Sequence, residues 1–199
     1  MQTSVSLRER KRTDTYRALH DAAAELVLDR GLQNVTVDEI AEQAGVSQRT
    51  FFNYFPTKED AVLGVRTPQL SGEHIDAYRN GAGRDLLTRV VELFAESVRS
   101  CFVPTDDLTR RRRLAAAHPE LRHRWMMKVA ETERLALQVV EDEREHLVDT
   151  PEAAQVLIHL AGAVIRFTYT TTPGAISVHD DVALTRAIDT FREVLRNTL

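Results

Sequence analysis

Residues 36–55 read TVDEIAEQAGVSQRTFFNYF, and this stretch decides the fold. Its opening threonine and the glutamate three residues later have the spacing of a capping box, which starts a helix. Gly45 lies where the chain must turn sharply, most easily with a positive φ angle. Ser47 can then cap a second helix over about residues 48–54. Two short helices joined by a tight glycine turn predict a helix-turn-helix, in which the second helix recognises DNA.

The two faces of this recognition helix carry different side chains. Helix geometry places Phe51 and Phe55 on an inner face. There they can form a small core with three residues of the preceding segment, Ile40, Ala41 and Val46. The outer face exposes four side chains that we expect to read bases, namely Gln48, Arg49, Phe52 and Asn53. Glutamine can read adenine, arginine can read guanine, and an aromatic ring can touch a thymine methyl group.

Hydroxyl groups, cations and helix starts surround this outer face, and such groups bind phosphates. The residues expected at DNA phosphates are Thr36, Thr50, Tyr54, Lys58, Arg10 and Arg12. The two arginines lie in a basic stretch that either clamps phosphates or forms a frayed, solvated end. The chain has 26 Lys and Arg against 30 Asp and Glu residues, so a generally basic nucleic-acid coat is excluded.

The rest of the 199-residue chain shows apolar residues at helical spacing and no sustained strand-like alternation. Most of its six prolines and eight glycines fall at candidate joints between helices. The first helix is expected from about Thr13 to Arg30, and shorter helices within residues 66–83 and 105–117. We therefore predict an all-α protein, with a DNA-binding domain over residues 1–57 and a helical regulatory domain over residues 58–199.

Apolar side chains of the second half are candidates for two surfaces. Those expected to line a ligand cavity, or else to form ordinary core, are Phe94, Val98, Phe102, Trp125, Met126, Val129 and Phe167. Those expected at a two-fold dimer interface on the last two helices are Val156, Leu160, Val164, Leu184, Ile188, Phe191 and Leu195. The four arginines 110–113 form either a solvated helix face or an anion site near the pocket mouth.

Residues 36–47 and 49–60 together resemble the signature of TetR-family transcriptional regulators. The resemblance implies a three-helix DNA-binding domain, a linking fourth helix, and a C-terminal helical domain that dimerises and senses a ligand. It places Gln48, Arg49 and Asn53 at bases and Thr36, Thr50, Tyr54 and Lys58 at phosphates. Phe52 replaces the tyrosine common in the family, so an apolar base contact is expected there instead of a phosphate hydrogen bond.

The stretch 118–135 resembles the C-terminal domain of mycofactocin-system regulators, which bind acyl-CoA. The likeness implies that the arginines at 110–113 meet the phosphates of coenzyme A while apolar residues hold the acyl chain. This resemblance suggests the chemistry of an effector but identifies no single ligand.

Other classes of protein find little support in the residues. The single cysteine, Cys101, excludes an intramolecular disulfide and a cysteine-built zinc site. His118 and His123 are five residues apart and do not share a helix face, and no catalytic constellation, metal site or cofactor motif is present. No apolar run approaches the length of a membrane span, and the N-terminal segment lacks the apolar core of a signal peptide. We expect a soluble, cytoplasmic protein.

The residues thus predict a homodimeric regulator that is not an enzyme and binds a palindromic operator in double-stranded DNA. We expect a repressor that a small apolar or acyl ligand, such as an acyl-CoA, releases from this operator. Two alternatives remain open. One is a helix-turn-helix regulator without a ligand, and the other is a helical-bundle enzyme or carrier whose N-terminal domain only packs.

Overall fold

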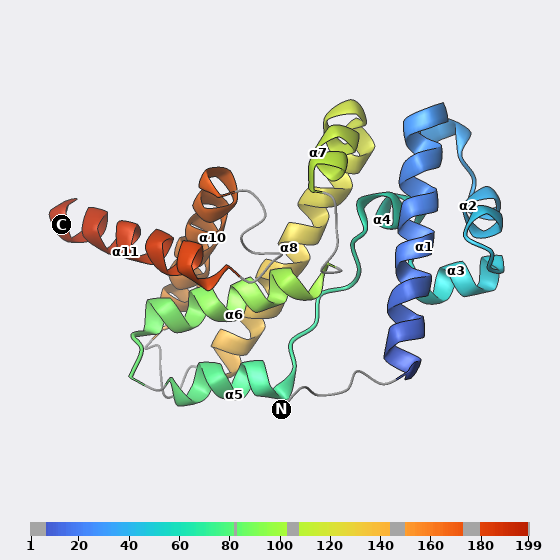
Figure 1. Ribbon diagram of the computed structural model, residues 1–199. Helices are drawn as coiled ribbons and strands as arrows, with labels where there is room; N and C mark the ends of the chain where they lie inside the picture. Colours follow the sequence, from blue (N-terminus) through green and yellow to red (C-terminus); the bar gives the residue numbers. More distant parts are fainter. Residues whose placement is uncertain (1–6, 82, 103–107, 144–149, 173–179, 199) are drawn as a thin grey trace. The chain divides into compact units, whose positions relative to one another are not determined.

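The computed structural model describes residues 7–81, 83–102, 108–143, 150–172 and 180–198. Every regular element in these ranges is helical, which confirms the predicted all-α fold (Figure 1). The helices are α1 (Leu7–Arg30), α2 (Val37–Gln43), α3 (Gln48–Tyr54), α4 (Lys58–Leu63), α5 (Gly72–Asn80), α6 (Leu86–Ser100), α7 (Leu108–Ala117), α8 (Pro119–Asp142), α10 (Pro151–Thr171) and α11 (Asp181–Thr198). None of these described helices is long and apolar enough to cross a membrane.

The chain forms two compact units. The first contains residues 1–66 and 105–127, and the second contains residues 67–104 and 128–199. This division differs from the expected boundary after residue 57, because α4 packs on α1 and α7 packs on both. The first turns of α8 also belong to the first unit. The unit that carries the helix-turn-helix is therefore larger than three helices.

Helix α1 is the central helix of the first unit, and α2 and α3 lie on one side of it (Figure 1). One face of α1 is buried, including Tyr16, Leu19, Ala23, Leu26 and Val27. Phe51 and Phe55 have no exposed surface, and the ring centroids of Tyr16 and Phe55 lie 4.5 Å apart. The expected core of the helix-turn-helix is confirmed for these two phenylalanines and for Ile40 and Ala41, which are also buried.

The first helix begins earlier than the sequence pattern predicted. Helix α1 starts at Leu7 instead of near Thr13, so Arg10 and Arg12 lie on its first turns. Arginine, lysine and glutamate are good helix formers, and this stretch contains little else. The alternative of a frayed end is therefore wrong for residues 7–12, where both arginines are exposed side chains of a helix.

Helix α4 is tied to α8 by a buried ion pair. Asp60 has no exposed surface, and its two carboxylate oxygens accept hydrogen bonds from Nε and Nη2 of Arg124 at 2.8 and 2.5 Å. A bidentate pair of this kind fixes the orientation of both partners as well as their distance. It holds the start of α8 on α4.

The four consecutive arginines do not form one solvated face. Arg111 is buried, donates from Nε to the carbonyl of Leu63 at 2.6 Å, and lies 5.7 Å from the ring centroid of Trp125. Arg110 forms an ion pair with Asp21 at 2.6 Å, which joins α7 to α1. The solvated reading is wrong for Arg111, because the α-helical spacing turns it toward α4 while its two successors remain exposed.

Gly64 permits a close approach between α4 and α1. It ends α4 in the left-handed region, with φ at 61°. A Cβ atom at this position would lie 2.9 Å from the His20 ring, whose Nδ1 atom is 2.7 Å from the carbonyl oxygen of Ala61. A larger residue at position 64 would therefore strain the backbone and push α4 away from α1.

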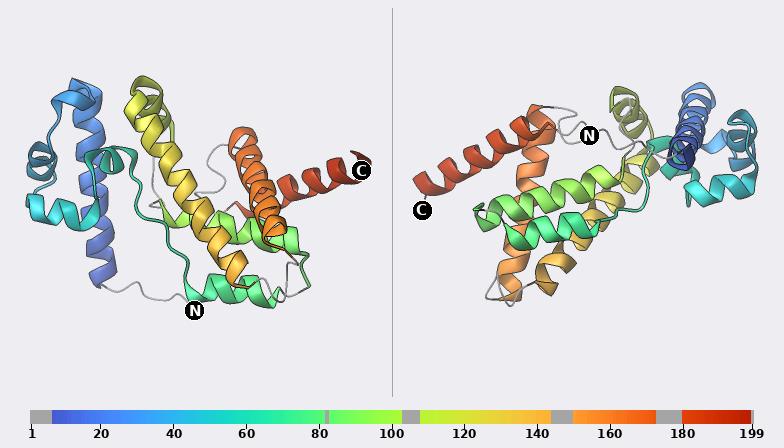
Figure 2. Two further views of the ribbon diagram at one scale, coloured as in Figure 1. Left: turned by 180° about the vertical axis from the view of Figure 1, so that it is seen from behind. Right: turned by 60° about the horizontal axis from the view of Figure 1, so that its bottom comes forward.

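In the second unit, α10 crosses α6, and α5, α8 and α11 complete the packing (Figure 2). Phe94 of α6 is buried against Gly162, where a Cβ atom would lie 3.4 Å from its ring. Ala161 is also buried in this core. These small residues of α10 allow close packing on α6 inside the unit.

The Asp60–Arg124 pair predicts a measurable coupling. Arg124→Ala should lower the free energy of unfolding by about 3 kcal/mol, because the fully buried carboxylate of Asp60 loses this partner. The double variant Asp60→Ala/Arg124→Ala should lose less than the sum of the two single losses. Urea unfolding measures all three, and Arg122→Ala, at an exposed position of α8, is the matched control. Strictly additive losses would show that the pair does not stabilise the unit.

Candidate DNA-binding surface and ligand cavity

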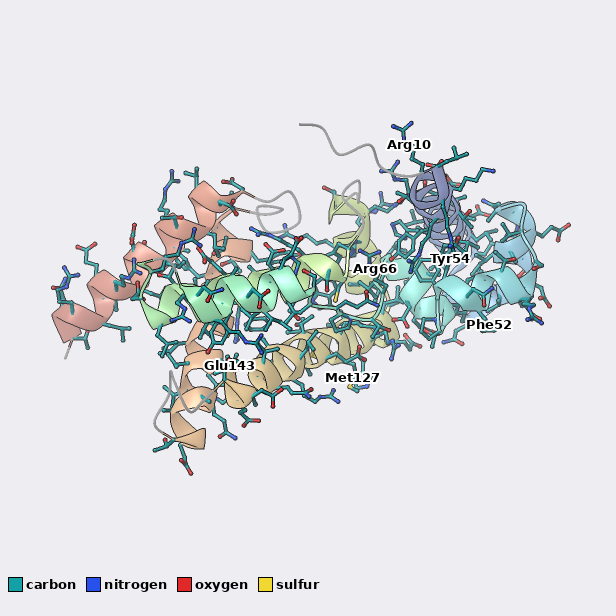
Figure 3. All side chains as sticks on the ribbon, turned by 90° about the horizontal axis from the view of Figure 1, so that it is seen from below. Arg10, Phe52, Tyr54, Arg66, Met127 and Glu143 are labelled. Atoms are coloured by element: carbon teal, nitrogen blue, oxygen red, sulfur yellow. The ribbon has the colours of Figure 1, made fainter. Side chains whose placement is uncertain are left out.

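The outer face of α3 presents the four predicted base-reading side chains together. Gln48, Arg49 and Asn53 are exposed, and Phe52 keeps 53% of its surface open to solvent. Figure 3 shows Phe52 on the outside of α3, and its ring packs edge-on against Phe51, with centroids 5.4 Å apart. An apolar ring held this way beside polar side chains suits the mixed edges of bases in the major groove.

The turn before α3 has the predicted conformation. Gly45 has φ at 68°, which favours glycine. Ser47 caps α3, because its hydroxyl oxygen accepts a hydrogen bond from the amide of Thr50 at 3.1 Å. The same hydroxyl lies 2.9 Å from the Thr50 hydroxyl. The cap fixes where α3 begins, and with it which side chains of α3 point outward.

The predicted phosphate contact at Thr36 is already engaged inside the protein. Its amide and its hydroxyl both donate to Oε2 of Glu39 at 2.8 Å, and the Glu39 amide donates back to the hydroxyl oxygen. These bonds from Thr36, helped by the nearby charge of Arg30, lower the pKa of the Glu39 carboxyl. The capping box is confirmed, and a phosphate would have to displace an ionised carboxylate to reach Thr36.

Lys58 also has partners within the first unit. Its ammonium group donates to the carbonyls of Leu32 and Val35 at 2.8 and 3.0 Å, which ties the start of α4 to the segment before α2. Tyr54 is half-buried, and Arg10 projects outward from α1 (Figure 3). The structure therefore leaves the predicted phosphate roles of Tyr54 and Arg10 open to test, and it gives Lys58 a structural role that its sequence position did not reveal.

The side chains predicted to line a ligand cavity differ in burial. Phe94 and Phe102 are buried, whereas Met126, Val129 and Phe167 are exposed on α8 and α10. Val98 is half-buried against the core of the second unit, and the half-buried Trp125 lies under the Arg111 guanidinium in the first. A common apolar pocket for these side chains stays a prediction, because apolar periodicity marks burial without saying against what.

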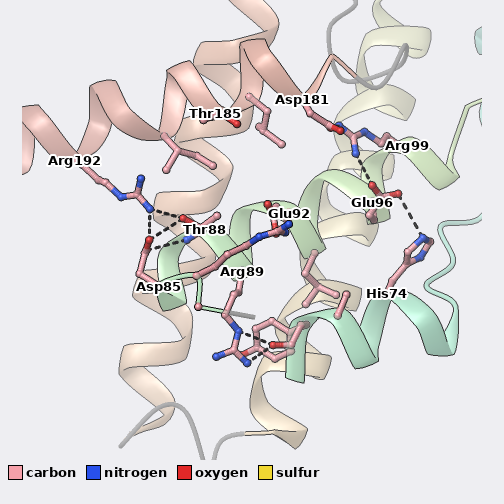
Figure 4. Close-up of a pocket in the computed structure, with 17 residues that line it drawn as sticks. His74, Asp85, Thr88, Arg89, Glu92, Glu96, Arg99, Asp181, Thr185 and Arg192 are labelled. Atoms are coloured by element: carbon pink, nitrogen blue, oxygen red, sulfur yellow. Dashed lines mark hydrogen bonds and ion pairs between the residues drawn. The ribbon is translucent and has the colours of Figure 1, made fainter. Parts of the chain in front are cut away.

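The second unit has a cavity of about 650 Å³, which we call the α6 pocket (Figure 4). It lies over α6, between α5 and α11, and its lining includes four arginines and four carboxylates: Arg84, Arg89, Arg99, Arg192, Asp85, Glu92, Glu96 and Asp181. Tyr78 also lines it, and burial raises the pKa of this tyrosine to about 12. The sequence pattern did not predict this site, although charges recur at helical spacing along α6.

Ion pairs connect the walls of the α6 pocket at both ends. At one end Arg192 of α11 pairs with Asp85 and contacts Thr88, and at the other Arg99 pairs with Glu96 and, at 2.9 Å, with Asp181 (Figure 4). These pairs hold α11 on α6.

The seven predicted dimer residues differ in burial. Val164, Leu184 and Ile188 are buried in the core of the second unit, so they cannot contact a second copy in this arrangement. Phe191 is half-buried and packs on Phe167, with ring centroids 5.8 Å apart. Three remain accessible in whole or in part, namely Val156, which is 56% exposed, and the half-buried Leu160 and Leu195.

The geometry of the first unit agrees with comparisons to known proteins. Residues 19–64 match the family model described as bacterial regulatory proteins, tetR family. The chain carries the DNA-binding domain of the TetR family. The match covers α2, α3 and α4 and the second half of α1, so it coincides with the helix-turn-helix and its buried support.

Two related proteins match this chain over longer stretches than the TetR domain of residues 19–64. An uncharacterized HTH-type transcriptional regulator of Mycobacterium bovis is 30% identical over 124 residues, which are 62% of this chain and 58% of that protein. The mycofactocin biosynthesis transcriptional regulator MftR of Mycobacterium tuberculosis is 41% identical over 73 residues, 34% of this chain and 37% of that one. The chain thus spans little more than half the length of the first relative.

A solved structure of a TetR-family repressor has a lower sequence identity to this chain. The Thermus thermophilus FadR structure, a TetR-family repressor in complex with lauroyl-CoA, is 23% identical and covers 92% of this chain and 95% of its own. Its TM-score of 0.36 is too low to relate its ligand site to the α6 pocket. Among the described residues, no group of three or more His, Cys, Asp or Glu side chains is placed to hold a metal ion.

The two carbonyl bonds of Lys58 predict that this residue stabilises the first unit. Lys58→Met should lower the free energy of unfolding by about 1–3 kcal/mol, because two carbonyls lose a charged donor. Arg49→Met, at an exposed site on α3, is the control and should leave stability within about 0.5 kcal/mol. Denaturant unfolding followed by circular dichroism measures both. Equal stability of the two variants would refute the structural role of Lys58.

Proposed function

We propose that this protein is a sequence-specific, DNA-binding transcriptional regulator and not an enzyme. The observation that supports this most strongly is the exposed face of α3, where Gln48, Arg49, Phe52 and Asn53 lie together within a matched TetR domain. The bases of an operator would be read by these four residues. A DNA-binding regulator acts where the DNA is, so we place it in the cytoplasm.

The charge of the first unit supports binding to DNA. Residues 1–66 alone contain 9 Lys and Arg against 10 Asp and Glu residues. With residues 105–127 included, the unit has 15 basic and 13 acidic residues, whereas the other unit has 11 and 17. The unit with the recognition helix is thus net positive and the other net negative. Positive charge on the DNA-binding unit favours approach to phosphates.

We further propose a homodimer on a palindromic operator. One recognition helix makes few base contacts, so two heads held about 34 Å apart, one turn of DNA, would give useful affinity. Several apolar side chains on α10 and α11 are exposed within the second unit, among them Val156, Val182 and Val194. Pairing these two helices across a two-fold axis would cover such side chains.

A small molecule would release the protein from its operator, so that it acts as a repressor. The size of the α6 pocket favours this reading over a regulator without a ligand. A purely apolar or acyl ligand, as expected from the sequence, would leave charged side chains without solvent in this pocket. An acyl-CoA would fit only with its acyl chain outside the charged walls.

Base reading by α3 predicts a change in sequence preference. Gln48→Ala or Arg49→Ala should cost about 1–3 kcal/mol at one or two base pairs and relax the preference there. Selection from randomised operators measures the preference of each variant. Glu42→Ala, on the exposed side of α2, is the control that should keep the wild-type preference. Wild-type preference in both α3 variants would remove these residues from base reading.

The dimer proposal predicts monomers when its exposed apolar contacts become charged. Val156→Asp should shift the protein to a monomer that keeps its helix content, since the side chain lies outside the core of its unit. Its operator affinity should fall with the loss of the second head. Light scattering and circular dichroism test this, with Val129→Asp on α8 as the exposed control. A Val156→Asp protein that stays dimeric would place the interface elsewhere.

A further inference from the structure

We propose that the α6 pocket binds a small molecule through an anionic group, a carboxylate or a phosphate, and that Arg99 is its main partner. Only the statement that this molecule is the effector rests on the proposed function. The pocket of about 650 Å³ lies within the range of small-molecule sites. Buried apolar side chains of Leu93, Leu184 and Ile188 contribute to its lining beside the charges.

At one end of the pocket, the side chain of Arg99 is more deeply buried than that of its acidic partner Asp181. The Arg99 side chain is only 7% exposed, whereas the side chain of Asp181, with which it pairs at 2.9 Å, is 78% exposed. Glu96, another partner of Arg99, is 24% exposed, and its carboxylate also lies 3.6 Å from Nε2 of His74. The guanidinium is therefore fixed by Glu96 from within the unit, and Asp181 meets it from the rim.

This asymmetry selects an anion. An anion that enters the pocket can replace Asp181 at little cost, because an exposed ion pair is weak and the released carboxylate returns to water. A cation that took Glu96 from Arg99 would place a second positive charge beside the nearly buried guanidinium, which is unfavourable. The planar guanidinium also matches a carboxylate or a phosphate with two parallel hydrogen bonds.

Replacement of Asp181 would act on α11. Asp181 is the first residue of α11, and its bond to Arg99 is one of the ties that hold this helix on α6. Arg192, farther along α11, supplies another through Asp85 and Thr88. An anion at Arg99 would loosen the start of α11 and leave the second tie in place. Because α11 belongs to the proposed dimer interface, the bound anion would change how the two copies pair.

The test uses the full chain and three probes at constant ionic strength: inorganic phosphate, succinate and the neutral 1,4-butanediol. Thermal unfolding and the NMR signals of the arginine Nε–H groups report binding. Phosphate or succinate should raise the unfolding midpoint and shift the Arg99 signal, and butanediol should do neither. A response to only one anion identifies phosphate or carboxylate as the chemistry. No response to either anion overturns the proposal.

Variants separate the pocket from a general salt effect. Arg99→Gln should weaken anion binding about tenfold or more, and Asp181→Asn should tighten it, because the competing carboxylate is gone. Arg186→Gln removes an exposed arginine of α11 outside the pocket lining and should bind like the wild type. Equal binding by the Arg99 and Arg186 variants overturns the proposal. If Arg99→Gln does not fold, unchanged affinity in Asp181→Asn has the same meaning.

Measurement of operator affinity tests the regulatory role of the anion separately from its binding in the α6 pocket. Saturating anion should lower operator affinity in the wild type and leave it unchanged in Arg99→Gln. Anion binding that leaves operator affinity unchanged overturns the effector role and supports the site itself. A wild-type protein that binds no DNA overturns the proposed function, and the anion titration still decides the pocket.

Discussion

The buried pair of Asp60 and Arg124 is the contact on which the DNA-binding unit depends. It joins α4, which follows the recognition helix, to the first turns of α8, and Arg111 reinforces it from α7 through the carbonyl of Leu63. A fully buried carboxylate needs such a partner, so α4 and α8 cannot separate without a large penalty. The helix-turn-helix is thereby built into a unit that also contains residues from the middle of the chain.

This arrangement gives α8 a particular importance. Its residues up to Met127 belong to the unit that carries α3, and the residues from Lys128 onward belong to the unit that contains the α6 pocket. Helix α8 thus contributes buried side chains to both units, Leu121 in the first and Ala136 and Val140 in the second.

The sequence predicted the fold well where local rules decide it. The capping box, the positive φ angle of Gly45 and the burial of Phe51 and Phe55 depend on neighbours within a few residues, and all are present. Prediction failed where the outcome depends on distant partners. The partner of Asp60 lies 64 residues away, so nothing local distinguishes this aspartate from the exposed Asp38.

The candidate sites show the same limit. The exposed face of α3 follows from helical periodicity, whereas the apolar pocket stays a prediction because periodicity does not say which buried faces enclose a space. The α6 pocket depends on charges of α5, α6 and α11 that meet only in the folded unit, such as Arg99 and Asp181. The sequence pattern assigned Glu39 to a helix cap and Lys58 to a DNA phosphate. Only the structure reveals the pairing of Glu39 with Arg30 and the hydrogen bond from Lys58 to the carbonyl of Leu32.

The central claim, that α3 reads a specific DNA sequence, is tested most directly by competition between two duplexes of equal length. One contains the palindrome that the protein selects from random DNA, and the other contains the same bases in scrambled order. We expect binding to the palindrome to be at least about 10³-fold tighter at physiological salt. The affinity for both duplexes should fall steeply as the salt concentration rises. Equal affinity for the two duplexes at every salt concentration would contradict it.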